Sequence, residues 1–126
     1  MSELSYIHAQ GFAAGELKHG PLALIDPQRP VVVLAPWDES FSKTLSNLHE
    51  VKARNGPVFL ITDTKGAASL EGLQPEGLFV YPSLQDPLLH VFPNAICVQL
   101  LAYYTALHKG LSIDQPRNLS KSVTVE

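Results

Sequence analysis

Two uninterrupted apolar runs constrain the fold of this chain more than any other feature. They occupy residues 30–35 (PVVVLA) and 57–62 (PVFLIT), and neither shows the polar alternation of a strand with one solvated face. Such runs are typical of parallel strands that are covered on both faces. The segment between them predicts an amphipathic helix, capped by Asp38 or Ser40 and ended by Asn55-Gly56, whose apolar stripe comprises Phe41, Leu45, Leu48 and Val51.

A strand, a helix and a second parallel strand need a crossover connection, which is right-handed almost without exception. The chain is therefore predicted to be α/β, a three-layer αβα arrangement with a small parallel sheet flanked by helices. A third, shorter strand is expected at residues 77–81, and a long last helix from residue 86 to residue 108. Weaker signals suggest a first helix from Glu3 to about Glu16, a buried turn at 22–25 and a loop at 63–76.

The composition disfavours several classes of protein. With 126 residues the chain is large enough for one domain with one ordinary core. A net charge of −3 without any block of Lys or Arg disfavours nucleic acid as a partner. The single cysteine, Cys97, cannot form an internal disulfide, so we expect a reducing, cytoplasmic location. Residues 1–10 do not resemble a secretory signal, and the most apolar stretch, Ile96–Leu107, is expected to be too short to span a membrane.

Three ionisable residues near the ends of the chain are candidates for chemistry, and each also has an ordinary structural explanation. Lys121 lies in the terminal segment, where a lysine is usually a solvated charge, but a desolvated amine there could condense with a sugar carbonyl. Glu3 is either an N-terminal helix charge or, in a pocket, a general base. His19 precedes the Gly20-Pro21 break and is either structural or an acid/base imidazole.

Other polar residues are given structural roles. Glu16 and Lys18 are expected to form a surface pair. The serines and threonines at 40–46 are interpreted as the capped start of a helix rather than as a phosphate site, because Asp38 and Glu39 would repel an anion there. No metal and no cofactor are expected, since the remaining histidines have no ligand spacing: His8, His49, His90 and His108.

Two long segments of the chain resemble one enzyme family. AAGELKHGPLALID (residues 13–26) and DQPRNLSKSVTVE (residues 114–126) resemble the C-terminal end of the glucosamine-6-phosphate synthases, the glutamine–fructose-6-phosphate aminotransferases. VVVLAP and QLLAYYTALHKG, which lie between them, fit the same family. The resemblance implies the second of two sugar isomerase (SIS) domains, with residues 1–111 as the SIS part and residues 112–126 as a catalytic tail.

The resemblance also implies an activity and a set of site residues. The family converts fructose 6-phosphate to glucosamine 6-phosphate with ammonia from glutamine, the entry step to UDP-N-acetylglucosamine. By the family's pattern, Glu3, which precedes SYIHA, moves the proton between C1 and C2 of the sugar. His19, in ELKHGP, assists ring opening and is contributed across the interface of a homodimer. Lys121 forms the Schiff base with the open-chain ketose, and Ser120 lies beside it in the sugar pocket.

The matching segment starts late relative to the family. The strand that opens this SIS domain, the first SIS domain with its sugar-phosphate loop and the glutaminase domain all come earlier in the family's order. We therefore expect an N-terminally truncated SIS domain that is inactive by itself. Two alternatives remain open: a non-catalytic module for sugar-phosphate binding or dimerisation, and an inactive fragment.

Overall fold

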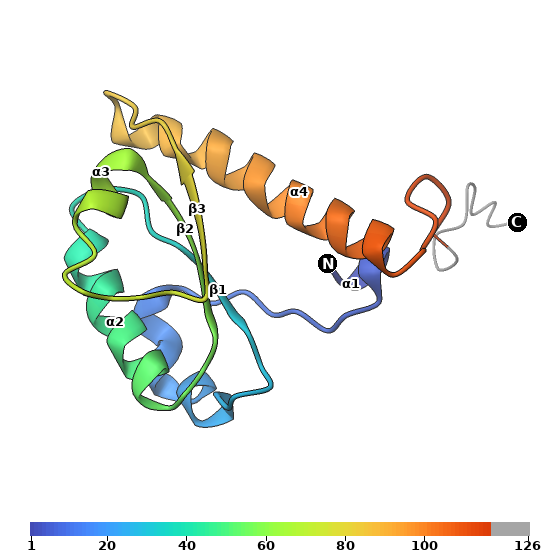
Figure 1. Ribbon diagram of the computed structural model, residues 1–126, viewed down its shortest axis with the longest axis horizontal. Coiled ribbons are helices and arrows are strands. Elements are labelled where there is room, and N and C mark those ends of the chain that lie inside the picture. Colours follow the sequence, from blue (N-terminus) through green and yellow to red (C-terminus); the bar gives the residue numbers. More distant parts are fainter. Residues whose placement is uncertain (117–126) are drawn as a thin grey trace, which may run out of the picture. The chain divides into compact units, whose positions relative to one another are not determined.

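The computed structural model describes residues 1–116 of the chain (Figure 1). These residues form two compact units, which are treated separately below. The larger unit comprises residues 12–94, and the smaller comprises residues 1–11 together with the described residues from 95 onward. The predicted tail at 112–126, including Ser120 and Lys121, therefore lies largely outside the described residues.

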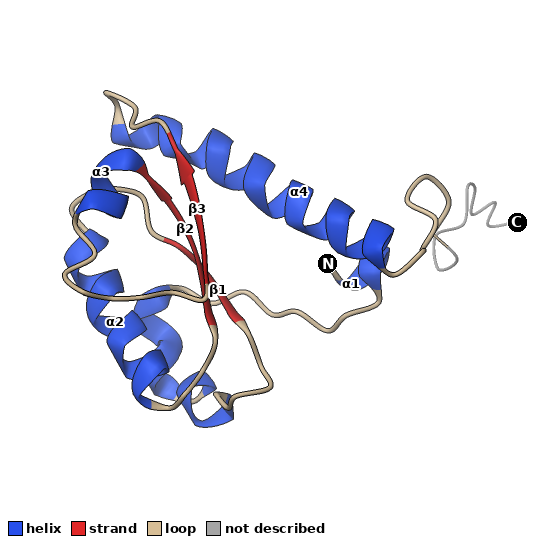
Figure 2. Cartoon of the chain, viewed as in Figure 1, coloured by secondary structure: helices blue, strands red, loops and turns tan. Residues whose placement is uncertain are grey.

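A small parallel sheet with helices forms the larger unit, as predicted. Its strands are β1 (Val31–Leu34), β2 (Val58–Asp63) and β3 (Gly77–Tyr81), in the order β1-β2-β3 (Figure 2). Both pairings are parallel, with Val31 opposite Val58 and Phe59 opposite Gly77. The apolar runs in the sequence thus locate all three strands to within one or two residues.

Helix α2 (Phe41–Ala53) supplies the crossover between β1 and β2 and closes the core of the larger unit. Its predicted apolar stripe is confirmed, because all four side chains are at most 4% exposed. They pack against the β1 and β2 side chains of one sheet face and against Leu22 of the short 3₁₀ helix η2 (Pro21–Leu24). Asn55 ends the helix with a left-handed φ of 58°, the conformation that Asn tolerates better than most residues.

The other face of the sheet is more open than the sequence predicts. Val32 and Leu34 of β1 are each 41% exposed, and Phe59 of β2 is 43% exposed. The register places Phe79 of β3, which is 50% exposed, on the same face. Within the larger unit, α2 packs on the opposite face of the sheet and leaves these side chains exposed.

The amino ends of β2 and β3 are joined through the Glu76 side chain. One carboxylate oxygen of Glu76 accepts from the Val58 backbone N–H at 2.5 Å, and the other pairs with Lys52 Nζ at 2.5 Å. These hydrogen bonds, of which the one from Lys52 is the strongest, lower the pKa of Glu76 to about 2. The carboxylate thus links α2 to the start of the sheet.

The N-terminal helix expected from Glu3 to Glu16 does not form. A four-residue helix, α1 (Ser2–Ser5), ends at Tyr6, whose φ is +52°, and the chain is not helical again until the 3₁₀ helix η1 (Ala14–His19). Gly11 and Gly15 lie in this stretch and lower its helix propensity.

Two short helices fall outside or at the edge of the predicted elements. The expected loop at 63–76 contains α3 (Thr64–Ala68), and the expected buried turn at 22–25 is part of η2, in which Leu22 is the buried residue. The last predicted helix is confirmed as η3 (Pro87–His90) followed by α4 (Val91–His108). Asp86 accepts from the Leu88 N–H at 2.9 Å and so caps its start.

The segment Pro87–His108 is longer than the apolar stretch seen in the sequence. Its 22 residues are apolar and long enough to cross a bilayer by length and composition alone, and an 18-residue window within it has a mean hydropathy of 1.2. The expectation that this region is too short is therefore wrong. A single helix of this kind is weak evidence for a membrane span, because the core helices of water-soluble proteins meet the same criterion.

Candidate functional site

Glu3 lies on α1, in the smaller unit, with its side chain exposed to solvent. Two hydrogen bonds hold this short helix against the end of α4. The hydroxyl of the buried Ser5 donates to the carbonyl of Ala102 at 3.3 Å, and Lys109 Nζ donates to the Ser5 carbonyl at 2.6 Å. Within residues 1–116 no hydrogen bond or ion pair engages the Glu3 carboxylate. The helix that carries Glu3 is therefore tied to α4, and the Glu3 carboxylate is exposed and has no partner among the described residues.

His19 ends η1 in the larger unit, immediately before Gly20, whose φ of +144° few residues other than glycine adopt. The imidazole is exposed, and its Nδ1 lies 3.1 Å from the Glu16 carboxylate. In a neutral ring, an Nδ1–H that donates to Glu16 leaves Nε2 as the free basic nitrogen. The break after His19 thus presents an oriented imidazole at the surface.

The expected surface pair of Glu16 and Lys18 is wrong, because each has another partner. Glu16 pairs with His19, and Lys18 Nζ lies 2.5 Å from the Glu50 carboxylate on α2. The turn is tied to the same helix by Asn47, which donates to the Ala14 carbonyl at 3.0 Å. Adjacent residues of a 3₁₀ turn point in different directions, so Glu16 and His19, three apart, share one side.

The three residues assigned to catalysis are not brought together by either unit alone. Glu3 belongs to the smaller unit and His19 to the larger one. Lys121 and Ser120 lie outside the described residues. The roles implied by the resemblance therefore remain predictions.

A buried polar network at the carboxyl ends of the strands was not anticipated from the sequence. Its centre is Asp63, which ends β2 and is fully buried. One oxygen accepts from the Trp37 N–H at 2.9 Å and from the Gly66 N–H at 3.2 Å, and the other accepts from the Ser83 hydroxyl. Asp63 thus joins the loops that follow β1 and β3 to the start of α3.

Burial by itself would raise the pKa of Asp63, but the hydrogen bonds from Ser83, Trp37 and Gly66 together outweigh it. The pKa of this carboxyl therefore lies below its usual value of 3.8, and the group is ionised at neutral pH. The Thr62 hydroxyl extends the network by donating to the Ala35 carbonyl at 2.6 Å.

Gly66 fits this network because it has no side chain. A Cβ at position 66 would overlap the Thr62 hydroxyl and lie 3.1 Å from the Asp63 carboxylate. The sequence carried a local signal for this part of the network, since an Asp three residues before the Gly is the spacing of an N-cap interaction. It carried no signal for Ser83, which is 20 residues from Asp63 along the chain.

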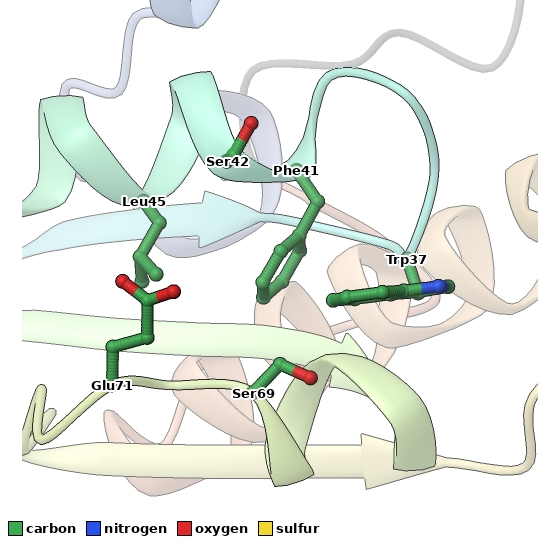
Figure 3. A pocket seen from close by; sticks show the side chains of 6 residues that line it. All are labelled: Trp37, Phe41, Ser42, Leu45, Ser69 and Glu71. Atoms are coloured by element: carbon green, nitrogen blue, oxygen red, sulfur yellow. The ribbon is translucent and has the colours of Figure 1, made fainter.

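A hollow next to this network is lined by side chains of α2, of the β1 loop and of the segment after α3. Its volume is about 320 Å³, and its lining comprises Trp37, Phe41, Ser42, Leu45, Ser69 and Glu71 (Figure 3). The carboxyl edge of a parallel sheet is where α/β proteins usually bind ligands. Among residues 1–116, no three His, Cys, Asp or Glu side chains are grouped so that they could hold a metal ion.

Comparisons with known proteins agree with the resemblance seen in the sequence. The glutamine–fructose-6-phosphate aminotransferase [isomerizing] of Bradyrhizobium diazoefficiens is 56% identical over 128 residues, and that of Mesorhizobium japonicum is 52% identical over 128 residues. Each match covers 100% of this chain but 20% of the relative, so the chain spans about a fifth of the length of these proteins.

A solved structure supports the same relationship. The C-terminal domain of glucosamine-fructose-6-phosphate aminotransferase from Francisella tularensis superposes with a TM-score of 0.73 at 43% identity, over 90% of this chain and 31% of that one. The SIS domain model matches residues 1–71, which is more than half of the sequence. The chain therefore belongs to the SIS domain family.

Proposed function

We propose that this chain supplies the C-terminal part of the isomerase site of a glutamine–fructose-6-phosphate aminotransferase. Such an enzyme makes glucosamine 6-phosphate from fructose 6-phosphate for hexosamine synthesis, in the cytoplasm. The observation that carries the proposal is the match of 52–56% identity along the whole chain to proteins of that name. In this proposal, residues 1–111 are the SIS part and residues 112–126 are the tail that closes the site.

The proposed chemistry divides the reaction among three side chains. His19 opens the sugar ring and exposes the C2 carbonyl. The amine of Lys121 attacks C2, water leaves, and an imine forms. Ammonia then displaces the lysine, so that the nitrogen stays on C2 and the lysine is released. Glu3 removes a proton from C1, which the imine has made acidic, and returns it to C2.

The exposed positions of two of these groups support the assignment. Glu3 has no partner among the described residues, and Glu16 leaves His19 with one free ring nitrogen. We propose that His19 acts in the site of a second copy and that Ser120 contacts the sugar beside Lys121. A homodimer with shared sites satisfies both requirements.

A chimera tests these roles in a complete enzyme. The matching C-terminal segment of the Bradyrhizobium diazoefficiens relative would be replaced by this chain, and glucosamine 6-phosphate formation measured. The chimera is expected to be active, and Glu3→Gln, His19→Ala or Lys121→Ala is expected to lower kcat by about 10²-fold or more, the usual worth of a positioned acid, base or nucleophile. Lys65→Ala, at an exposed lysine of α3, is the control and should keep full activity.

Two further tests distinguish the proposed catalytic role of Lys121 from mere relatedness to the aminotransferases. Treatment of the chimera with fructose 6-phosphate and borohydride should attach sugar to Lys121 and leave Lys121→Ala unlabelled. An active chimera that tolerates Lys121→Ala would refute the imine. The 126-residue chain alone is expected to show no turnover with fructose 6-phosphate and ammonium, because it spans 20% of its relatives and positioning of the substrate supplies much of the rate, up to ~7–11 kcal/mol.

A non-catalytic SIS module is the second candidate, and the open sheet face favours it. Val32, Leu34 and Phe59 form an apolar surface suited to dimerisation. Saturable binding of fructose 6-phosphate to the 126-residue chain, without borohydride labelling of the chain or of the chimera, would support this candidate over the first.

A further inference from the structure

The short helix α1, which carries Glu3, depends on contacts outside itself. It has four residues, which is barely one turn, and isolated helices of that length are unstable in water. Its last carbonyl groups have no partner within the helix, as at the end of every α-helix. Ser5 is its one buried residue, and both the hydroxyl and the carbonyl of Ser5 are bonded to other parts of the smaller unit.

Lys109 supplies the donor for the carbonyl of Ser5. Its ammonium group donates at 2.6 Å, and a lysine at this end of a helix also complements the helix dipole. Within residues 1–116 no carboxylate pairs with the Lys109 amine. The bond from the Ser5 hydroxyl to the Ala102 carbonyl is longer, at 3.3 Å, and joins two neutral groups. Lys109 therefore makes the stronger of the two bonds that hold α1.

The backbone of Lys109 is fixed by the way in which α4 ends. The Leu111 N–H donates to the Ala106 carbonyl at 3.0 Å. The Gly110 N–H donates to the Leu107 carbonyl at 2.9 Å, which completes a Schellman motif. Gly110 has the left-handed backbone that this motif requires, with a φ of +67°. Lys109 directly precedes this glycine, so its side chain starts from a defined position.

We infer that Lys109 is a positioning residue for Glu3 in the transfer of a proton between C1 and C2 of the sugar. The inference rests on the proposed function, in which Glu3 is the base. Glu3 lies two residues before Ser5 on α1, so the bond from Lys109 determines where its carboxylate is held. Lys109 thus acts on the rate through Glu3, and not through binding of the sugar or formation of the imine.

Steady-state kinetics of the chimera test this role. Lys109→Met keeps the apolar stem but removes the amine, and it is expected to lower kcat about tenfold, since a misplacement of ~1 Å can cost up to ~10²-fold. The KM for fructose 6-phosphate should stay within about twofold of the parent value, because the lost interaction serves the transition state. Lys109→Arg keeps a charged donor and should keep kcat within about threefold of the parent.

Lys43→Met is the matched control. Lys43 is an exposed lysine of α2 whose amine has no partner within residues 1–116. This variant should keep the kcat and the KM of the parent chimera. A Lys109→Met variant that does the same would overturn the inference.

Two further readouts distinguish positioning of Glu3 from general damage to the site. Borohydride labelling of Lys121 with fructose 6-phosphate should be kept in Lys109→Met, because the imine forms before Glu3 acts. Adding Lys109→Met to Glu3→Gln should change kcat by less than about twofold, since effects of residues that act through one another are not additive. Loss of labelling, or the same loss of rate in the double variant as in the parent, would overturn the inference.

Hydrogen exchange tests the contact without reference to catalysis. The Tyr6 N–H donates to the Ser2 carbonyl at 3.1 Å and so reports whether α1 is formed. In the chimera, the amides of a peptide that spans α1 should exchange at least about fivefold faster in Lys109→Met than in the parent or in Lys43→Met, because α1 opens more often. Equal exchange in all three would show that Lys109 does not hold the helix.

The same variants separate a failure of this inference from a failure of the proposed function. If Glu3→Gln lowers kcat and Lys109→Met does not, the inference is refuted and the proposed function stands. If Glu3→Gln keeps the kcat of the parent chimera, Glu3 is not the base, and the proposed role of Glu3 fails together with the inference.

Discussion

Asp63 shows how one side chain can organise an edge of a sheet. Its two carboxylate oxygens receive donors from the loop after β1, from α3 and from the loop after β3. Since hydrogen bonds to a charged group stabilise more than neutral ones, the ionised form of Asp63 is the one that the fold requires. The same bonds fix the backbone of Trp37 at one end of the hollow.

Replacing Asp63 by Asn tests this role. Asp63→Asn is expected to lower the free energy of unfolding by about 1–3 kcal/mol at pH 7, because the charged acceptor is lost from a buried network. The folded pKa is lowered, so the stabilisation is present above the unfolded value near 3.8 and is lost as pH falls through the folded value. The free energy of unfolding, measured with urea, should therefore fall more steeply with decreasing pH in the parent chain than in Asp63→Asn.

Glu39→Gln is the control for this experiment, since Glu39 is exposed and makes no bond within the described residues. It should match the parent chain at both neutral and acidic pH. Equal stability of Asp63→Asn and the parent at pH 7 would show that the network does not depend on the charge.

At the residue level, the sequence was informative where the signal was local. The Gly-Pro break after His19 matches the end of a 3₁₀ helix. The roles that the resemblance assigns to Glu3 and His19 stay predictions. The partner of Lys18 was missed because Glu50 lies 32 positions away, on another element. Ser83 was missed for the same reason, as nothing near it in sequence indicates a buried carboxylate.

At the level of elements, α2 and the N-terminal segment show why one helix was predicted correctly and the other was not. The α2 stripe repeats every three or four residues and is buried along its whole length. The segment from Glu3 to Glu16 has apolar residues at similar spacing, but Gly11 and Gly15 oppose a helix. Its exposed Ile7 and Phe12 show that no core was available to offset that cost.

Leu48 measures how much α2 contributes to stability. Leu48 is 2% exposed in the core between α2 and the sheet. Leu48→Ala is expected to lower the free energy of unfolding by about 2–5 kcal/mol, since it removes buried methyl groups and leaves a cavity. Denaturant unfolding followed by circular dichroism would measure the loss. Ser46→Ala, on the exposed side of the same helix, should change stability by less than about 0.5 kcal/mol.

At the level of the whole molecule, the apolar side chains exposed on one sheet face of the larger unit are expected to influence self-association. The α/β class and the positions of the three strands followed from the apolar runs, but periodicity cannot show what covers a face. The side chains that share it carry no charge: Val32, Leu34, Phe59 and Phe79. A surface of this kind usually marks an interface or favours aggregation.

The 126-residue chain is therefore expected to self-associate as its concentration rises. Sedimentation velocity would detect this, and Val32→Lys, which puts a charge on the edge strand β1, should shift the equilibrium toward the monomer. Ser46→Lys adds the same charge on the exposed side of α2 and should leave the association unchanged. A parent chain that stays monomeric at all concentrations would contradict the expectation.

The tight fit at Gly66 has a consequence for how this protein can change over generations. Any single-base substitution that replaces a glycine codon with that of another amino acid adds at least one carbon, and here that carbon would overlap the Thr62 hydroxyl. While Thr62 and Asp63 are kept, every single-base amino-acid substitution at codon 66 is therefore expected to disrupt this packing. Only synonymous changes are expected to accumulate at this codon. Replacement of Gly66 by another residue would first require a substitution at position 62.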